Sequence, residues 1–402
     1  AVVQIDHTRV DIVLVDDRTR QPIGRPWLTL AVDVFSRMVA GYYLSFDDPS
    51  VTSVGLCMAH AILPKEEWLI MHDVEAEWPV WGFPAKVHVD NGPDFQADDF
   101  KRSCAMYGID VDFRPVRTPR YGGHIERLLG TLMKEVHGLP GTTFSSVPHK
   151  GEYDSDKHAA LTMAEFEKWL VHFICKVYHE SLHRGIGMAP IQKWKQGIFG
   201  HAGLPGSEVP SRPSDRHTVL LDFMPSFKRT VQRTGVEIEG LKYYAEALRP
   251  WINYVDPVTG GKKKFLFRRD PRDVTVIWFR DPDLEGYVKV PVADQSLPPM
   301  SLWEYREIRA RLKQQGISRA SSLDLAHAHK ELTEIVERAS EKTRKARRMA
   351  QRRKEHARKK SPAPDPAVVQ KPEPQTETQG KKGSSLFGDV DFDAIEPYEE
   401  IE

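Results

Sequence analysis

The sequence predicts a mixed α/β sheet with flanking helices, then a small all-β barrel, then a C-terminal helical region and a disordered tail. Three observations lead to this prediction. Residues 1–200 hold strand-like runs followed by alternating strand-like and helical segments. Residues 210–295 hold short β-like runs between turn signals. Residues 300–360 return to a helical pattern, and residues 361–402 are too polar to bury a core.

Three strands should open the first domain. They cover Val2 to Val15, roughly, then Trp27–Asp33 and Met38–Leu44. Further along we expect a helix, a strand, a helix and a strand at Ser50–Leu63, Lys86–Asp90, Gln96–Tyr107 and Asp110–Arg114. Antiparallel strands that precede alternating strands and helices are typical of a mixed sheet with helices on its faces.

Residues 125–136 show the clearest helical pattern. Apolar residues recur at intervals of three and four and so form one stripe, made of Ile125, Leu128, Leu129, Leu132, Met133 and Val136. Glu126 lies about 100° from Ile125, at the border of this stripe, so it can approach the sheet. We expect a second amphipathic helix over Met163–Tyr178.

Six short runs predict the strands of the second domain. They are Thr218–Phe223, Arg229–Val236, Lys242–Tyr244, Lys264–Phe267, Val274–Phe279 and Tyr287–Val290. Turn signals such as Asp256-Pro257 and Gly260-Gly261 separate them. Strands of this length and spacing are typical of a small barrel or sandwich.

Several features limit the class of protein. No run of about 18 apolar residues is present, so we expect no membrane span. The N-terminus lacks a secretory pattern, and it begins without Met inside a strand-like run, which suggests a fragment of a longer protein. The three cysteines Cys57, Cys104 and Cys175 are widely spaced and suit a reducing cytoplasm better than a disulfide framework or a zinc site.

The net charge of zero conceals a strong separation of charge. Residues 301–360 carry 18 Lys and Arg against 8 Asp and Glu, whereas residues 361–402 carry 3 against 10. The basic part predicts contact with a nucleic-acid backbone, through residues that include Arg344, Arg347, Arg348 and Arg352. A solvated charged helix is the alternative.

The acidic tail ends in a segment that mixes large apolar residues with acids. Its apolar residues favour a docking segment that becomes ordered on a partner: Leu386, Phe387, Phe392 and Ile395. A merely solubilising end is the alternative.

Three carboxylates suggest the chemistry. Asp6 lies in an extended segment, Asp90 ends an apolar run before Asn91-Gly92, and Glu126 follows after 35 residues. Taken singly, each has an ordinary explanation in turn chemistry or in the helix dipole. Together, on two strands and a helix, they can hold two divalent cations for phosphodiester chemistry.

The residues that flank these carboxylates resemble the integrase catalytic core of DDE transposases and retroviral integrases. The resemblance covers residues 1 to about 200 and includes the segments 33–37, 88–95, 117–127 and 178–185. It implies an RNase H-like sheet, with Asp6, Asp90 and Glu126 as catalytic residues that bind two Mg²⁺ ions, with Mn²⁺ as the alternative ion. It also implies that Asp6 bridges both ions.

The β-rich segment 234–248 resembles the C-terminal barrel domain of the Mu transposase group, and within it the TniA and TnsB transposases. This resemblance implies Mg²⁺-dependent cleavage at transposon ends and strand transfer of the 3′-hydroxyl ends into target DNA. It implies a homo-multimer on paired DNA ends in a bacterial, nucleoid-associated cytoplasmic setting. It further implies that the tail engages an AAA+ regulator of target selection. The helix-turn-helix modules of such proteins precede the core and are not found in this sequence.

Four basic residues lie near the carboxylates in the sequence. Arg117, Arg120, Arg127 and Lys134 could contact DNA phosphates or could be solvated surface. Two other functions also remain open: an RNase H-like nuclease or resolvase that cuts without joining, and an inactive DNA-binding scaffold.

Overall fold

The structure is a computed structural model, and it describes residues 1–17, 19–92, 95, 97–113, 122–143, 154–258, 260–284, 286–314, 324–326, 328–330 and 344–358. These residues belong to one compact unit, Ala1–Ser361. The tail over 361–402, with Leu386, Phe387, Phe392 and Ile395, lies outside the described residues, as do Arg117 and Arg120.

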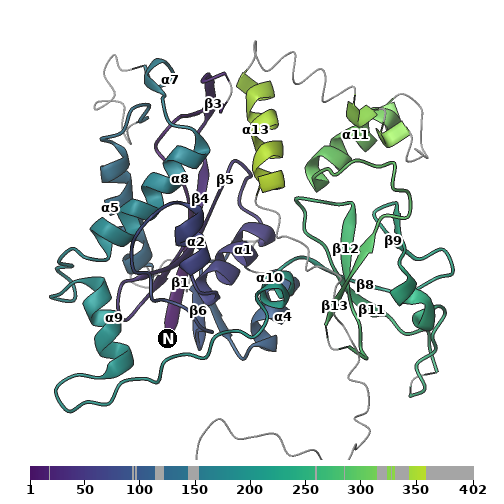
Figure 1. Cartoon of the computed structure of the whole chain (residues 1–402), viewed down its shortest axis with the longest axis horizontal. Helices are drawn as coiled ribbons and strands as arrows, with labels where there is room; N and C mark the ends of the chain where they lie inside the picture. Colours follow the sequence, from purple (N-terminus) through teal and green to yellow (C-terminus); the bar gives the residue numbers. More distant parts are fainter. Residues whose placement is uncertain are drawn as a thin grey trace, which may run out of the picture. The chain divides into compact units, whose positions relative to one another are not determined.

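A five-stranded mixed sheet forms the centre of the first domain (Figure 1). The strand order is β5-β4-β1-β6-β7, with antiparallel pairs from β5 to β1 and parallel pairs from β1 to β7. The strands are β1 (Val2–Arg9), β4 (Trp27–Asp33), β5 (Val39–Ser45), β6 (Lys86–Val89) and β7 (Asp110–Phe113). The prediction of a mixed sheet is confirmed, and the sheet fits an RNase H-like fold.

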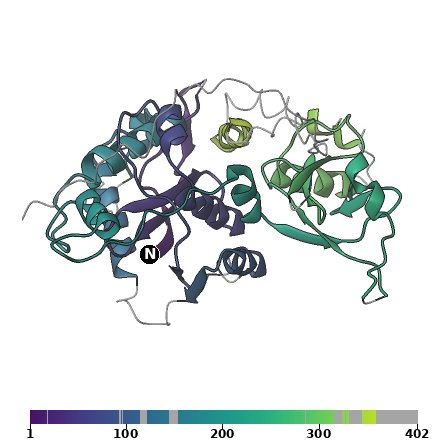
Figure 2. The same cartoon turned by 60° about the horizontal axis from the view of Figure 1, so that its bottom comes forward.

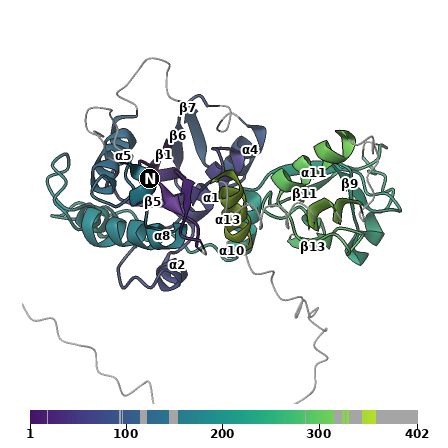
Figure 3. The ribbon, with the colours of Figure 1, turned by 90° about the horizontal axis from the view of Figure 1, so that it is seen from above.

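Helices cover both faces of this sheet. Figures 2 and 3 show α5 (Gly123–Val136) on one side, and α1 (Val51–Ile62) with α4 (Asp98–Met106) on the other. α5 packs on β1 and β4, whereas α1 packs on β4 and β5. Because both faces are covered, the central strands are buried on both: Leu30 and Ala31, successive residues of β4 that point to opposite faces, are at most 1% exposed.

The first strand is shorter than the sequence suggested. β1 pairs with β4 only as far as Arg9 opposite Trp27. The next residue that could pair on the partner side is Pro26, which precedes Trp27 in the chain. Proline has no N–H, so the ladder cannot continue past it. The chain instead forms β2 (Leu14–Val15), which pairs with β3 (Pro22–Gly24).

Other helices in the described part of the first domain are α2 (Glu66–Met71), α7 (Ser155–His158), α8 (Met163–His172) and α9 (Pro190–Phe199). A capping box begins α8, since the Thr162 hydroxyl accepts from the Glu165 N–H and the Glu165 carboxylate accepts from the Thr162 N–H. The helix expected over Met163–Tyr178 is continuous, but its last turns form the π-helix η2 (Phe173–Tyr178).

Residues 216–222 form a helix, α10 (Arg216–Asp222), where the sequence suggested a strand. Asp215 caps it by accepting hydrogen bonds from the His217 N–H and the Thr218 hydroxyl. A short apolar run does not distinguish a strand from a buried helix, and here the cap decides. Val219 and Phe223 belong to the hydrophobic core of the first domain.

The second domain contains two small sheets around one hydrophobic core. A four-stranded sheet has the order β13-β12-β11-β8, and a two-stranded sheet pairs β9 with β10. The elements are β8 (Ser226–Arg229), β9 (Val236–Ile238), β10 (Leu241–Tyr243), the 3₁₀ helix η3 (Glu246–Trp251), β11 (Phe265–Arg268), β12 (Val276–Arg280) and β13 (Tyr287–Pro291). The strand expected over Arg229–Val236 is instead a turn between β8 and β9, where Gly235 has a φ of 91°.

Two helices of the third region are described, α11 (Leu302–Gln314) and α13 (Arg344–Arg358). α11 buries Tyr305, Ile308 and Leu312 in the core of the second domain. α13 packs against β3. No helix in the described part of the chain is long and apolar enough to cross a membrane.

Candidate active site

The strand register brings Asp6 and Asp90 together. β1 and β6 are parallel neighbours, and Gln4 is paired with His88. Asp6 and Asp90 each follow this pair by two residues. Asp6 lies within β1 and Asp90 directly follows β6, so in this register the two aspartates occupy corresponding positions of neighbouring strands, whose axes are about 4.8 Å apart. Both are half-buried.

Local hydrogen bonds orient both carboxylates. Oδ1 of Asp6 accepts from the His7 N–H at 2.8 Å, and Oδ1 of Asp90 accepts from the Gly92 N–H at 2.8 Å. A Cβ at Gly92 would lie 2.9 Å from that Asp90 oxygen, so glycine allows this tight turn. The His7 ring stacks on Phe95, with ring centroids 4.9 Å apart, and so connects β1 to the loop after β6.

Glu126 occupies the first turn of α5 and is exposed. The helix packs through the apolar stripe that the sequence predicts: Ile125, Leu128, Leu129, Leu132 and Val136 are buried, and Met133 is partly buried. Residues 114–121, which connect β7 to this helix, lie outside the described residues.

The described residues contain no group of three His, Cys, Asp or Glu side chains that could hold a metal ion. The structure therefore brings Asp6 and Asp90 together but does not add Glu126 as a third ligand. The donor set itself suits the implied ion, because Mg²⁺ prefers carboxylate oxygens and often uses only one or two of them.

A basic pocket of about 290 Å³ lies against α5 at Arg127, the residue that follows Glu126 in the sequence. Arg127 lines it from α5, Tyr178 from the end of η2, and His183 and Arg184 from the segment that follows η2. Arg37 approaches from the turn between β4 and β5, where the Tyr178 hydroxyl donates to its carbonyl oxygen at 3.0 Å. Sequence reasoning selected only Arg127 here, although segments 33–37 and 178–185 both belonged to the recognised motifs. Lys134 is exposed further along α5.

The arginines of α13 contact the protein itself. The Arg344 Nε and the Arg347 Nε donate to the carbonyl oxygens of Ile23 and Pro22, at 3.2 and 3.1 Å. Arg348 donates to the Phe46 carbonyl at 2.8 Å. Arg352 pairs with Asp47, as does His356 at 2.7 Å. DNA contact by these arginines stays a prediction, and the first domain occupies one side of this helix.

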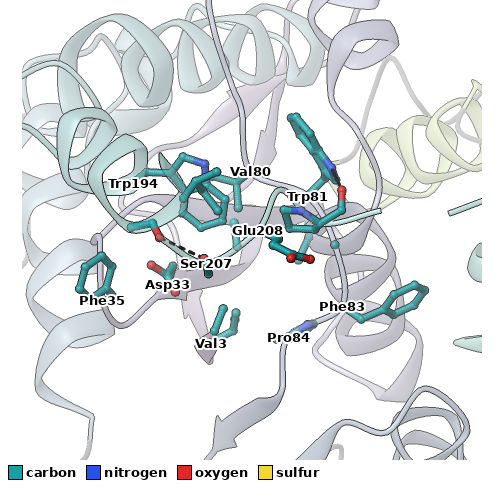
Figure 4. A pocket seen from close by; sticks show the side chains of 17 residues that line it. Val3, Asp33, Phe35, Val80, Trp81, Phe83, Pro84, Trp194, Ser207 and Glu208 are labelled. Carbon is teal, nitrogen blue, oxygen red and sulfur yellow. Dashed lines mark hydrogen bonds between the residues drawn. The ribbon is translucent and has the colours of Figure 1, made fainter. Parts of the chain in front are cut away.

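A larger apolar cavity of about 410 Å³ lies apart from the three carboxylates (Figure 4). Asp33 lines it and is 2% exposed. Its Oδ2 accepts from the N–H and the hydroxyl of Ser36 at 2.7 and 2.6 Å. In Figure 4 its carboxylate lies between Phe35 and Glu208, below Trp194. These contacts close the turn after β4 and thereby position Arg37.

Comparisons with known proteins identify two successive domains. Residues 4–141 match the TnsB C-terminal domain, and residues 221–289 match the C-terminal domain of Mu transposase. The transposase of transposon Tn552 from Staphylococcus aureus is 28% identical over 331 residues, which are 81% of this chain and 62% of that protein. The Tn7 transposition protein TnsB from Escherichia coli is 28% identical over 267 residues, 62% of this chain and 37% of that protein.

The chain thus spans less than two thirds of either relative. Similar solved structures include the catalytic core domain of BIV integrase, at 18% identity and a TM-score of 0.28 over 48% of this chain and 91% of that one. Another is the catalytic core domain of HTLV-2 integrase in complex with magnesium, at 15% identity and a TM-score of 0.26 over 48% and 93%. The two domain matches confirm the resemblance to the Mu transposase and TnsB group.

Proposed function

From a chain in which a TnsB C-terminal domain precedes a Mu transposase C-terminal domain, we infer a DNA transposase that cleaves transposon ends and joins the 3′ ends to target DNA. The observation that carries this proposal is the position of Asp6 and Asp90 on adjoining parallel strands. Glu126, in the first turn of α5, is the third proposed catalytic residue.

Asp6, Asp90 and Glu126 would hold two Mg²⁺ ions, or Mn²⁺. Bound there, such ions activate the attacking oxygen and stabilise the leaving oxygen of an in-line displacement at phosphorus. The protein's own contribution is orientation. The N–H groups of His7 and Gly92 each bind one carboxylate oxygen and thereby restrict the rotation of Asp6 and Asp90.

Asp90→Asn tests the proposal. This variant should lose Mg²⁺-dependent joining of a transposon 3′ end and should still bind DNA. Asp283→Asn, an exposed aspartate of the second domain, is the matched control and should join at the wild-type rate. Joining by Asp90→Asn at the wild-type rate would refute the assignment. A gel that separates cleavage from joining distinguishes a transposase from a nuclease or resolvase.

An inactive DNA-binding scaffold is the second candidate. The observation that favours it is that, within the described residues, the carboxylates do not form a three-ligand group. Metal-dependent joining of a pre-cut end by the wild-type chain would exclude it.

The proposed partners are those that the resemblance to the TniA and TnsB transposases implies. They are transposon-end and target DNA, further copies of this chain, and an AAA+ regulator that binds the tail through Leu386, Phe387, Phe392 and Ile395. The proposed location is the bacterial cytoplasm, near the nucleoid. A pull-down of the regulator with and without residues 384–402 tests the docking segment, and equal recovery would exclude it.

A further inference from the structure

The basic pocket at Arg127 combines segments that are far apart in the sequence. Arg127 directly follows Glu126 on α5, while His183 and Arg184 lie more than fifty residues later. Arg127 and Arg184 are both exposed, so their guanidinium groups can reach a partner. The amide of Gly185 donates to Nδ1 of His183 at 3.2 Å and holds this turn in shape.

The lining of the pocket suits an anion. Among the described residues that line it, none is Asp or Glu, whereas Arg127, His183 and Arg184 can carry positive charge. Thr131, Tyr178 and Ser181 add hydroxyl groups. Guanidinium groups bind phosphate through two parallel N–H bonds, and hydroxyl groups can donate to the remaining oxygens.

The positive charges of the pocket act on one another. Burial lowers the pKa of His183, and the charges of Arg37 and Arg127 lower it further. Burial also lowers the pKa of Arg37. The charges of Tyr178 and Asp33 raise this pKa, whereas the charge of Arg127 lowers it further. An anion bound here relieves the repulsion between the guanidinium groups of Arg37 and Arg127 and favours the protonated form of His183.

We propose that this pocket binds a backbone phosphate of the DNA strand on which the carboxylates act, through Arg127, Arg184 and His183, with Arg37 behind them. The proposal rests on the proposed function, because it concerns the DNA of that same site. DNA is the partner that the charge favours, since neutralisation of phosphates by Lys and Arg supplies essentially all of the affinity in non-specific DNA binding. Leu182, which is 71% exposed at the rim, offers an apolar surface beside the phosphate site.

The test measures the salt dependence of DNA binding with the full chain carrying Asp90→Asn, which separates binding from chemistry. Fluorescence anisotropy of a labelled duplex is measured at salt concentrations from about 50 to 200 mM. It gives the slope of the logarithm of affinity against the logarithm of salt concentration. Arg127→Gln and Arg184→Gln should each lower the magnitude of this slope by about 1 and weaken binding at every sequence tested. Arg212→Gln is the control, because Arg212 is exposed and already pairs with Glu66.

Slopes equal to that of the parent in both variants would overturn the proposal. An unchanged slope together with altered self-association in ultracentrifugation would assign the pocket to a protein partner and overturn it equally. The joining assay of the wild-type chain reports on the proposed function separately. If the slopes are lowered but the wild-type chain does not join DNA, the phosphate site is supported and the transposase function is rejected. If the wild-type chain joins DNA but the slopes are unchanged, the function is supported and the phosphate site is rejected. If the parent binds no DNA, both fail.

Discussion

The Nε2 atom of His179 accepts a hydrogen bond from the backbone N–H of Val39 over 3.0 Å. His179 follows the π-helix η2 and is fully buried, and Val39 begins β5. The bond therefore attaches the end of this helix to the edge of the sheet. It requires that Nε2 carries no proton. Burial lowers the pKa of His179 to about 3, and the charge of Lys65 contributes in the same direction.

This bond predicts how stability depends on pH. The unfolded chain takes up a proton at His179 below about pH 6.5, whereas the folded chain does so only near pH 3. Stability from this group is therefore lost as the pH falls below 6.5, by about 1.4 kcal/mol per unit. Urea unfolding at pH 7 and at pH 5 tests this. Between these two pH values, the free energy of unfolding should fall by about 2 kcal/mol less in His179→Gln than in the wild type. Equal losses in both proteins would contradict this reading.

Replacement of glycine by alanine should have opposite effects on stability at two helical positions. A Cβ at Gly55 in α1 would lie 2.1 Å from the carbonyl oxygen of Phe223, a backbone atom that cannot rotate away. A Cβ at Gly130 in α5 would meet nothing within 4 Å. Gly55→Ala should cost about 2 kcal/mol or more, and Gly130→Ala should add about 0.5–1 kcal/mol from helix propensity. Thermal or urea unfolding of both variants measures this, and a stable Gly55→Ala protein would show that α1 does not pack as described.

Asp47 should control how firmly α13 is bound. Burial opposes ionisation of Asp47, but hydrogen bonds and charges of His356 and Arg352 lower its pKa to about 2. Because the folded pKa is lowered, this contribution is complete above about pH 4 and is lost as the pH falls towards 2. At neutral pH, Asp47→Asn should increase trypsin cleavage within residues 344–358, as mapped by mass spectrometry. Asp283→Asn is the control, and identical cleavage in the two variants would show that Asp47 does not hold the helix.

Glu126 predicts a separation of activity from stability. Its side chain is exposed and its helix is held by the apolar stripe beneath it, so Glu126→Gln should change unfolding free energy by no more than about 0.5 kcal/mol. Loss of a proposed metal ligand should reduce Mg²⁺-dependent joining by about 100-fold or more. A drop in both properties would indicate a structural role for Glu126 instead.

Much of the first domain was predictable because its patterns are local. The stripe from Ile125 to Val136 determines which face of α5 is buried, and apolar runs locate β4 and β6. Two errors came from effects that such patterns do not contain. Pro26 ends β1 from the partner strand, and the Asp215 cap converts an apolar run into α10. Pro26 lies outside the predicted strand that it shortens, and Asp215 lies outside the apolar run that it turns into a helix.

The sequence by itself determined the order of the domains, the three carboxylates and the family that they resemble, because motif residues and periodicity are written along the chain. Only the tertiary structure gave the register between the strands of Asp6 and Asp90, and it brought Arg37 to Tyr178, 141 residues away, near the basic pocket at Arg127. It also showed the arginines of α13 bound to the first domain. The reason is that contacts between distant segments depend on how strands pair and helices pack, and this leaves no local pattern in the sequence.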